Sequence, residues 1–160
     1  MRVGVGYDVH GLVTGRGLIL GGVRIPYSLG LAGHSDADVL IHAIIDALLG
    51  AAALKDIGAH FPPGDPQYAG ISSLELLRRT KDVLDGEGWQ TENVDATIVA
   101  EHPKLMPFID DMREHISEAL GVEKGRISVK ATTTEGLGFA GRGEGIAAHA
   151  VALIERARGG

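Results

Sequence analysis

The sequence predicts a single α/β domain of the α+β type that spans residues 1–160. The length of 160 residues and the hydrophobic content of 44% are sufficient for one core. Segments with the two-residue period of strands are interleaved with segments of helical period. No linker, internal repeat or low-complexity tract divides the chain, so we expect one sandwich of sheet and helices.

The composition argues against several classes of partner. The net charge of −6 provides no basic field for nucleic acid. The chain has no cysteine, which rules out disulfides and thiolate metal ligands and suits a reducing compartment. Its start does not resemble a signal peptide, and its longest apolar run, residues 39–54, is shorter than the ~20 residues that span a bilayer. We therefore expect a cytoplasmic protein that associates with neither membranes nor nucleic acid.

The N-terminal part predicts a strand and then a small hairpin. Residues 2–7 have the pattern of a strand that leads directly into Asp8 and His10. Two short apolar runs around a Gly-Gly pair predict a hairpin over residues 18–26. Residues 30–38 are polar and contain two glycines, so we expect a loop before the next element.

Three segments have helical period: residues 36–54, 72–85 and 107–120. Ser35 or Asp36 can cap the first of these helices. Ser72 and Glu75 have the spacing of a capping box at the start of the second. Gly121 supplies the residue that commonly ends a helix such as the third.

Two later segments, residues 94–100 and 126–134, alternate with period two and predict strands. Residues 144–155 leave two interpretations open, because alanine favours a helix whereas the alternation also suits a strand buried on both faces. Residues 55–68 contain three prolines and two glycines and predict an irregular loop. Loops of this kind carry function more often than the elements that they join.

Three side chains predict a metal site. Asp8 and His10 point to the same face of a strand, because strand side chains alternate. His42 lies within the most apolar helix, and two imidazoles with one carboxylate are a common set for catalytic zinc. Asp38 and Asp46 lie four residues on either side of His42, so either could hold its second ring nitrogen. The alternative is that His42 is an ordinary core histidine.

Two further segments have the character of phosphate sites. The expected start of the first helix, residues 33–36, would present backbone amides to phosphate oxygens, although it could equally be a plain cap. Residues 132–135, Thr-Thr-Thr-Glu, place hydroxyls and a carboxylate at the end of a strand, where they could bind phosphate or metal. Threonine runs are also ordinary in strands.

Together these motifs resemble one known family over residues 1–155, the 2-C-methyl-D-erythritol 2,4-cyclodiphosphate synthases of the non-mevalonate isoprenoid pathway. The motifs are Gly6-Tyr-Asp-Val-His10, Gly21-Gly-Val-Arg-Ile-Pro26, His34-Ser-Asp-Ala-Asp38, Asp46-Ala-Leu-Leu-Gly-Ala-Ala-Ala53, Asp56-Ile-Gly58, Lys130-Ala-Thr-Thr-Thr-Glu135 and Gly138-Phe-Ala-Gly-Arg-Gly-Glu-Gly145. Their order and spacing match, which is far more specific than any one of them. The resemblance implies a lyase in which the 2-phosphate of 4-diphosphocytidyl-2-C-methyl-D-erythritol 2-phosphate attacks the β-phosphate and releases CMP. No protein nucleophile is required, so catalysis consists mainly of positioning and charge stabilisation.

The resemblance also implies roles for individual residues. The zinc ligands would be Asp8, His10 and His42, and Glu135 would bind a second divalent cation, Mg²⁺ or Mn²⁺. His34 and Thr133 would act in catalysis, with Thr133 as a donor to the transition state. The substrate would contact the residues of five segments: Asp8, His10, His34 and Ser35; Asp56, Ile57, Gly58, Phe61 and Asp65; Ala100, Lys104, Leu105 and Met106; Thr132, Thr133, Thr134 and Glu135; and Phe139 and Arg142.

The resemblance further implies an assembly. The family forms a homotrimer around a threefold axis, with active sites at subunit interfaces. Each subunit would have a mixed, mainly four-stranded β-sheet covered by helices on one face, which favours a strand over residues 144–155. The sheets would surround a cavity that could hold an isoprenoid diphosphate, near Arg142 and Glu144.

The chain departs from the family pattern at two places, and two other functions remain as alternatives. Pro63-Gly64 replaces residues that are usually more polar, and His102 stands where small residues are usual.

One alternative is a zinc hydrolase, although the chain has no His-Glu-x-x-His motif of the common peptidases. The other is a trimeric isoprenoid-binding protein with a structural metal, which would more often have four protein ligands.

Overall fold

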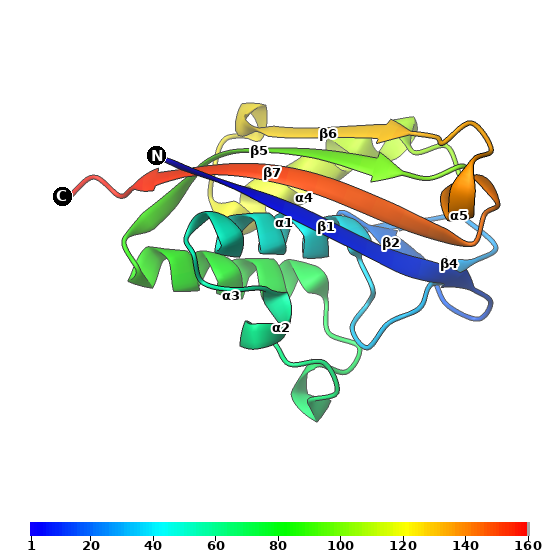
Figure 1. Ribbon diagram of the computed structural model, residues 1–160, viewed down its shortest axis with the longest axis horizontal. Helices are drawn as coiled ribbons and strands as arrows, with labels where there is room; N and C mark the ends of the chain where they lie inside the picture. Colours follow the sequence, from blue (N-terminus) through cyan, green and yellow to red (C-terminus); the bar gives the residue numbers. More distant parts are fainter. Residues whose placement is uncertain (160) are drawn as a thin grey trace.

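The computed structural model describes residues 1–159 and shows one mixed sheet with helices packed against it (Figure 1). The strands are β1 (Arg2–Val13), β2 (Leu18–Leu20), β3 (Val23–Ile25), β4 (Gly30–Leu31), β5 (Trp89–Val99), β6 (Ile127–Thr132) and β7 (Gly145–Arg156). The helices are α1 (Val39–Ala51), α2 (Ile57–His60), α3 (Ser73–Gly86), α4 (Ile109–Leu120) and α5 (Gly138–Gly141). Short 3₁₀ turns cover Pro66–Tyr68, Met106–Phe108 and Lys124–Arg126.

The main sheet has five strands in the order β4-β1-β7-β5-β6, and β2 pairs with β3 in a separate hairpin. Only β5 and β6 are parallel, so the sheet is mixed as predicted. The predicted count of mainly four strands omits β4, a pairing of two residues with the end of β1. The hairpin turns at Gly21 and Gly22, both of which have the positive φ that glycine adopts without strain.

The segment with two open interpretations is a strand. β7 lies between β1 and β5 at the centre of the sheet, and its alanines at 148, 150 and 152 are buried. The helix propensity of alanine is overridden here, because β7 hydrogen-bonds to a strand on each edge and packs beneath α1. Small side chains at these positions leave room for α1, which packs against β7.

Two glycines of β1 bring α1 directly onto the strand. A Cβ built at Gly4 would lie 2.0 Å from the carbonyl oxygen of Ala47, and one at Gly6 would lie 1.8 Å from that of Ala43. No side chain fits at either position. The next residues on the same face of β1 are Asp8 and His10, which therefore meet the first turn of α1.

Two predicted helix starts and one predicted capping box are corrected. The helix expected over residues 36–54 spans only Val39–Ala51, and its cap is Asp38, whose side chain accepts from the amide of Ile41. Ser35 and Asp36 cannot cap it, because Ala37 lies between them and the helix with a φ of 57°. Helix α3 starts where expected, but its capping box is not formed, since the side chain of Ser72 makes no capping hydrogen bond. The start of the third helix is also later, at Ile109, and it ends at left-handed Gly121 as predicted.

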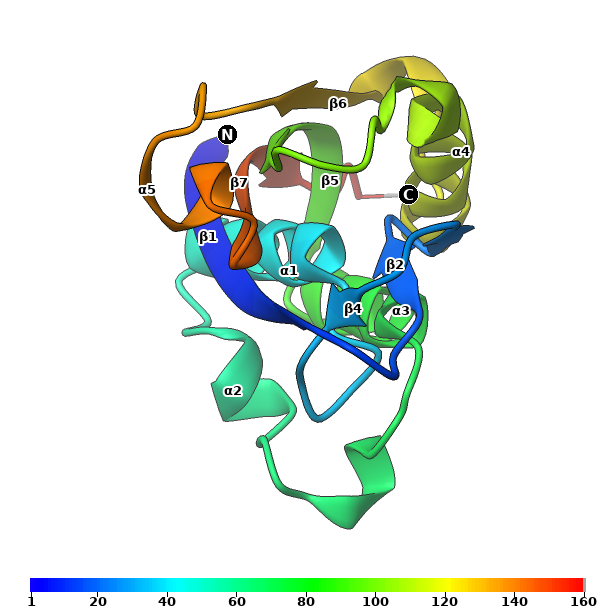
Figure 2. The ribbon, with the colours of Figure 1, turned by 90° about the vertical axis from the view of Figure 1, so that its right-hand side faces the viewer.

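The two faces of the sheet differ. Helix α1 covers β1 and β7 on one face, α4 packs against β6, and α3 lies against both α1 and α4, as Figures 1 and 2 show. The opposite face of β1 exposes Val3, Val5, Tyr7 and Val9, next to exposed Val151 of β7. No helix of residues 1–159 is long and apolar enough to cross a membrane.

Candidate metal centre and active site

The structure brings the three predicted metal ligands together. Oδ2 of Asp8 lies 2.9 Å from Nε2 of His10 and 3.1 Å from Nδ1 of His42. The two histidine nitrogens lie 3.2 Å apart. Tetrahedral zinc with bonds of ~2.0–2.1 Å separates its ligand atoms by about 3.3 Å, so the set fits a zinc ion with small adjustments. Among residues 1–159 this is the group of His, Asp and Glu side chains that could hold a metal ion.

Electrostatics keeps the carboxyl group of Asp8 ionised. Partial burial acts to raise its pKa, but the interactions of the carboxyl group with His10 and His42 outweigh this and hold the pKa well below its usual range. For His10, burial acts to lower the pKa, whereas the hydrogen bond and charge of Asp8 raise it more. An ionised carboxylate is the form that binds a metal ion, and it stands ready in this site.

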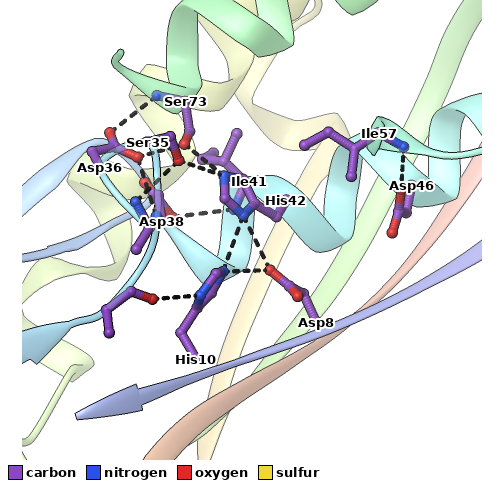
Figure 3. A network of polar contacts seen from close by, with 12 residues as sticks. Asp8, His10, Ser35, Asp36, Asp38, Ile41, His42, Asp46, Ile57 and Ser73 are labelled. Atoms are coloured by element: carbon purple, nitrogen blue, oxygen red, sulfur yellow. Dashed lines mark hydrogen bonds and ion pairs between the residues drawn. The ribbon is translucent and has the colours of Figure 1, made fainter. Parts of the chain in front are cut away.

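Each histidine is held from its far side. Nδ1 of His10 lies 2.8 Å from the carbonyl oxygen of Ala32, which accepts its proton and leaves Nε2 directed at Asp8. Nε2 of His42 lies 2.9 Å from Oγ of Ser73 and 3.2 Å from Oγ of Ser35 (Figure 3). Outer partners of this kind fix the orientation of metal-binding imidazoles.

The two carboxylates expected to hold His42 serve other groups. Asp38 accepts hydrogen bonds from the backbone amides of Gly21, Gly22 and Ile41, which tie the hairpin to the start of α1. Burial and then the neighbouring Asp36 raise the pKa of Asp38 to about 6, against the lowering effect of these amides. Asp46 accepts from the amide of Ile57 at 2.8 Å, as Figure 3 shows. The predicted orienting role of both residues is therefore wrong, because their carboxylates accept from backbone amides and Nε2 of His42 is held by serines instead.

The metal ligands open into a cavity of about 200 Å³. We call this cavity and its ligands the metal pocket; its lining residues are Asp8, His10, His34, Ser35, His42, Ile57, Gly58, Phe61, Pro63, Tyr68 and Leu76. Most were predicted, but Tyr68 and Leu76 were not. The ring of Tyr68 packs edge-on against Phe61 with centroids 5.7 Å apart, and an aromatic residue in a proline-rich loop was the available signal.

Two predicted substrate residues organise the loop around the metal pocket. Asp56 caps α2 through the amide of Ala59 at 3.0 Å. Asp65 caps the turn at Pro66–Tyr68, and its carbonyl oxygen accepts from Nε2 of His34 at 2.9 Å. His34 is thereby joined to the far side of the loop.

The segment 33–36 is not the helix N-terminus that the sequence predicted. The helix begins later, and the three amides immediately before it are already bonded. The amide of Asp36 donates to the carbonyl of Ile71, that of Ala37 to Oγ of Ser35, and that of Asp38 to the Asp36 carboxylate. These three amides are not free to bind phosphate.

The remaining predicted residues form a second group, which we call the loop region: residues 100–106 and 132–142. The parallel strands β5 and β6 end side by side here, so their following loops meet. The carboxylate of Glu101 accepts from the amides of Thr134 at 3.2 Å and Gly136 at 3.0 Å, which joins the two loops. Glu135 between them has a φ of 53°. Sequence reasoning missed Glu101, which carries no motif of its own.

The side chains of the loop region point mainly to solvent. Met106 is 84% exposed and Phe139 is 36% exposed, whereas Leu105 is buried. Arg142 already pairs with Glu144 at 2.8 Å. The residues of this region do not line the metal pocket of their own chain. Within residues 1–159, the predicted site is therefore divided into two parts.

Comparison with known proteins agrees with the resemblance of the motifs. The model of the YgbB family matches residues 1–155. The chain belongs to the YgbB family. A curated relative from Moorella thermoacetica, named 2-C-methyl-D-erythritol 2,4-cyclodiphosphate synthase, is 66% identical over 154 residues, which cover 96% of this chain and 94% of the relative. A relative of the same name from Thiobacillus denitrificans is 65% identical over 98% of both chains.

Solved structures show the same fold within the family. A structure named 2C-methyl-D-erythritol-2,4-cyclodiphosphate synthase has a TM-score of 0.88 and 36% identity, with coverage of 96% of this chain and 100% of the other. The CDP complex of IspF from Plasmodium falciparum has a TM-score of 0.86 and 32% identity, with coverage of 98% and 97%. The bifunctional IspDF from Campylobacter jejuni has a TM-score of 0.93 and 42% identity over 97% of this chain, which spans 42% of that protein's length.

Proposed function

We propose that this member of the YgbB family converts 4-diphosphocytidyl-2-C-methyl-D-erythritol 2-phosphate to 2-C-methyl-D-erythritol 2,4-cyclodiphosphate with release of CMP. The observation that carries the proposal is the convergence of Asp8, His10 and His42 at a cavity, in a chain 66% identical to an enzyme of that name. It is a cyclising lyase of isoprenoid precursor biosynthesis. Residues 1–160 act as one domain, and the cytoplasmic location stays an expectation from the sequence.

The ligands in the metal pocket would hold zinc, and Glu135 would hold Mg²⁺ or Mn²⁺ through a carboxylate oxygen. Bound zinc supplies a Lewis acid for a phosphoryl oxygen and a template for the substrate. The protein's own task is to place the attacking 2-phosphate against the β-phosphate and to exclude water from it. The metal pocket suits this task, because Phe61, Tyr68 and Leu76 add apolar surface to its lining.

The other predicted residues receive roles within this proposal. His34 and Ser35 line the metal pocket and would bind the diphosphate, with His34 acting in catalysis. The segment 56–58, with Phe61 and Asp65, would hold the methylerythritol part. In the loop region, residues 100–106, including Lys104, would bind cytidine. Thr132 to Glu135 would bind the phosphates, with Thr133 as a donor to the transition state. Phe139 and Arg142 would give further contacts. The structural similarity to an IspF complex with CDP supports a cytidine nucleotide as part of the substrate.

A homotrimer would join the two parts of the site. The exposed face of the sheet carries Val3, Val5, Tyr7, Val9 and Val151, and such an apolar patch is typical of a surface that packs against another protein. Packing three sheets around an axis would bring the loop region of one subunit to the metal pocket of its neighbour. The same packing would enclose the cavity proposed for an isoprenoid diphosphate, with Arg142 and Glu144 near its end.

Mixing of variants tests whether the sites are shared. His42→Ala removes a ligand from the metal pocket, and Lys104→Ala changes the loop region. In a mixed trimer, some interfaces should join the intact metal pocket of a Lys104→Ala subunit to the intact loop region of a His42→Ala subunit. We expect partial recovery of turnover after subunit exchange, measured against each variant alone. Exchange demonstrated by mass spectrometry without any recovered turnover would show that each site lies within one chain.

Phosphorus NMR tests the reaction itself. The zinc-loaded protein is incubated with the diphosphocytidyl substrate and Mg²⁺, and we expect CMP together with two coupled cyclic-diphosphate resonances. CMP without the cyclic product would establish a zinc hydrolase instead. An unchanged substrate, with zinc bound and the trimer intact, would favour the isoprenoid-binding alternative.

A further inference from the structure

His42 is held between two different environments. Its Nδ1 faces the other metal ligands, 3.1 Å from Oδ2 of Asp8 and 3.2 Å from Nε2 of His10. Its Nε2 faces away from them, 2.9 Å from Oγ of Ser73 at the start of α3 (Figure 3). Ser73 is completely buried, so its hydroxyl must be satisfied by protein groups alone.

The partner of Ser73 determines where its single proton points. Oγ of Ser73 donates to Oδ1 of Asp36, and Oδ2 of Asp36 accepts from the backbone amide of Ser73 at 3.0 Å. A carboxylate can accept hydrogen bonds but cannot donate them. The hydroxyl proton is therefore committed to Asp36, and the lone pair of Oγ is left to accept from Nε2–H of His42.

This direction of hydrogen bonding selects one tautomer of His42. With the proton on Nε2, Nδ1 carries the lone pair, and Nδ1 is the atom that faces Asp8 and His10. A neutral imidazole binds a metal through its unprotonated nitrogen. Ser35 also approaches Nε2, at 3.2 Å, but it lies farther from that nitrogen than Ser73 does at 2.9 Å.

We propose that Asp36 and Ser73 are positioning residues for the metal pocket: they fix the tautomer and ring orientation of His42 so that Nδ1 is presented to the metal. The arrangement also ties the segment before α1 to the first residue of α3, so both elements hold the ligand in place. Asp36 reaches His42 through Ser73 and also accepts from the amide of Asp38, and neither Asp36 nor Ser73 lines the metal pocket. This inference rests on the proposed zinc site and adds to it the means by which one ligand is prepared.

The direct test is the zinc affinity of Ser73→Ala, measured by competition with a chromogenic chelator and without any turnover. We expect the dissociation constant for zinc to rise about 10- to 100-fold, the usual effect of losing such an outer partner. Ser72→Ala is the matched control, because that neighbouring serine is exposed and its side chain makes no capping bond. The control should bind zinc like the wild type.

A second readout separates positioning from general damage to the fold. Nitrogen NMR of the His42 imidazole in the zinc-free wild type should show the proton on Nε2, and Ser73→Ala should shift the population toward Nδ1–H. Asp36→Asn, which keeps the size of the side chain but not its charge, should weaken zinc binding in the same direction. The Asp36→Asn variant also provides the test of the proposal if Ser73→Ala does not fold.

The outcomes distinguish this inference from the proposed function. Wild-type protein that binds no zinc would overturn the metal site itself. Wild-type protein that binds zinc, with folded Ser73→Ala or Asp36→Asn binding equally well, would overturn only the positioning role. An unchanged tautomer in folded Ser73→Ala would do the same, since His42 would then be oriented without the hydroxyl.

Discussion

The metal pocket and the loop region are built in opposite ways. In the metal pocket, the side chain of His42 is only 11% exposed, and both ring nitrogens of His10 and of His42 have partners within the chain. In the loop region, Met106 and Thr133 are exposed, and the segments are joined mainly by Glu101. The first is complete within one chain, whereas the second presents side chains to solvent.

The difference indicates which properties belong to the single chain. A preorganised ligand set loses little entropy when a metal binds, so zinc affinity should depend on the monomer fold alone. Groups that face solvent gain strength only when another surface excludes water from them. Substrate recognition by the loop region should therefore depend on assembly. The variants described next test this contrast.

The largest effect is expected for His42→Ala. Loss of one of three metal ligands should remove bound zinc and lower turnover by roughly 1,000-fold without a change in oligomeric state. Zinc content by elemental analysis and mass by light scattering measure the two properties. His102→Ala is the matched control for zinc content, since His102 is an exposed histidine that does not line the metal pocket. Full zinc occupancy in His42→Ala would remove His42 from the ligand set.

Gly6→Ala tests whether the metal pocket depends on the approach of α1 to β1. The new Cβ would lie 1.8 Å from the carbonyl oxygen of Ala43, a backbone atom that cannot move alone. We expect a loss of about 3 kcal/mol or more in the free energy of unfolding, measured by urea denaturation. At Gly11 of the same strand the nearest atom is 3.8 Å away, so Gly11→Ala should be tolerated. Equal stability of the two variants would contradict the close-packing argument.

Asp38 makes the stability of the folded chain depend on pH. Its folded pKa of about 6 lies above the ordinary value of 3.8, so the folded chain holds a proton that the unfolded chain has released between these values. Its contribution to stability is therefore largest below pH 3.8 and is lost as pH rises to about 6, a change of roughly 3 kcal/mol. Urea denaturation of zinc-free protein should show that this slope disappears in Asp38→Asn. Asp111→Asn, at an exposed position of α4, is the control and should retain it.

The sequence predicted the group of possible metal ligands from local rules and the family resemblance together. Alternation along a strand places Asp8 and His10 on one face, and the motifs identified the family that the comparison confirmed. Helical spacing alone misassigned Asp38 and Asp46, because it reports which residues share a face but not which backbone amides compete for a carboxylate.

What could not be predicted depends on contacts between distant segments. Ser73 meets His42 across 31 positions of the chain, and Glu101 meets Gly136 across 35. Neither residue belongs to a pattern that spacing can reveal, since a lone serine or glutamate is usually a surface residue. The strand β7 was settled by resemblance, because alanine propensity pointed to a helix and only its two neighbouring strands override it.

The smallest effect is expected in the loop region, for Glu135→Gln. The amide keeps the size of the side chain but removes the negative charge that would attract a second cation, so we expect about tenfold more Mg²⁺ to be needed for half-maximal turnover. Zinc content should be unchanged, because Glu135 does not line the metal pocket. Glu123→Gln, also exposed but distant in sequence from every proposed site residue, is the control. A shift in zinc content without a shift in the Mg²⁺ titration would mean that the two regions are not independent, because a change in the exposed loops would then act on a ligand set that the fold alone should hold.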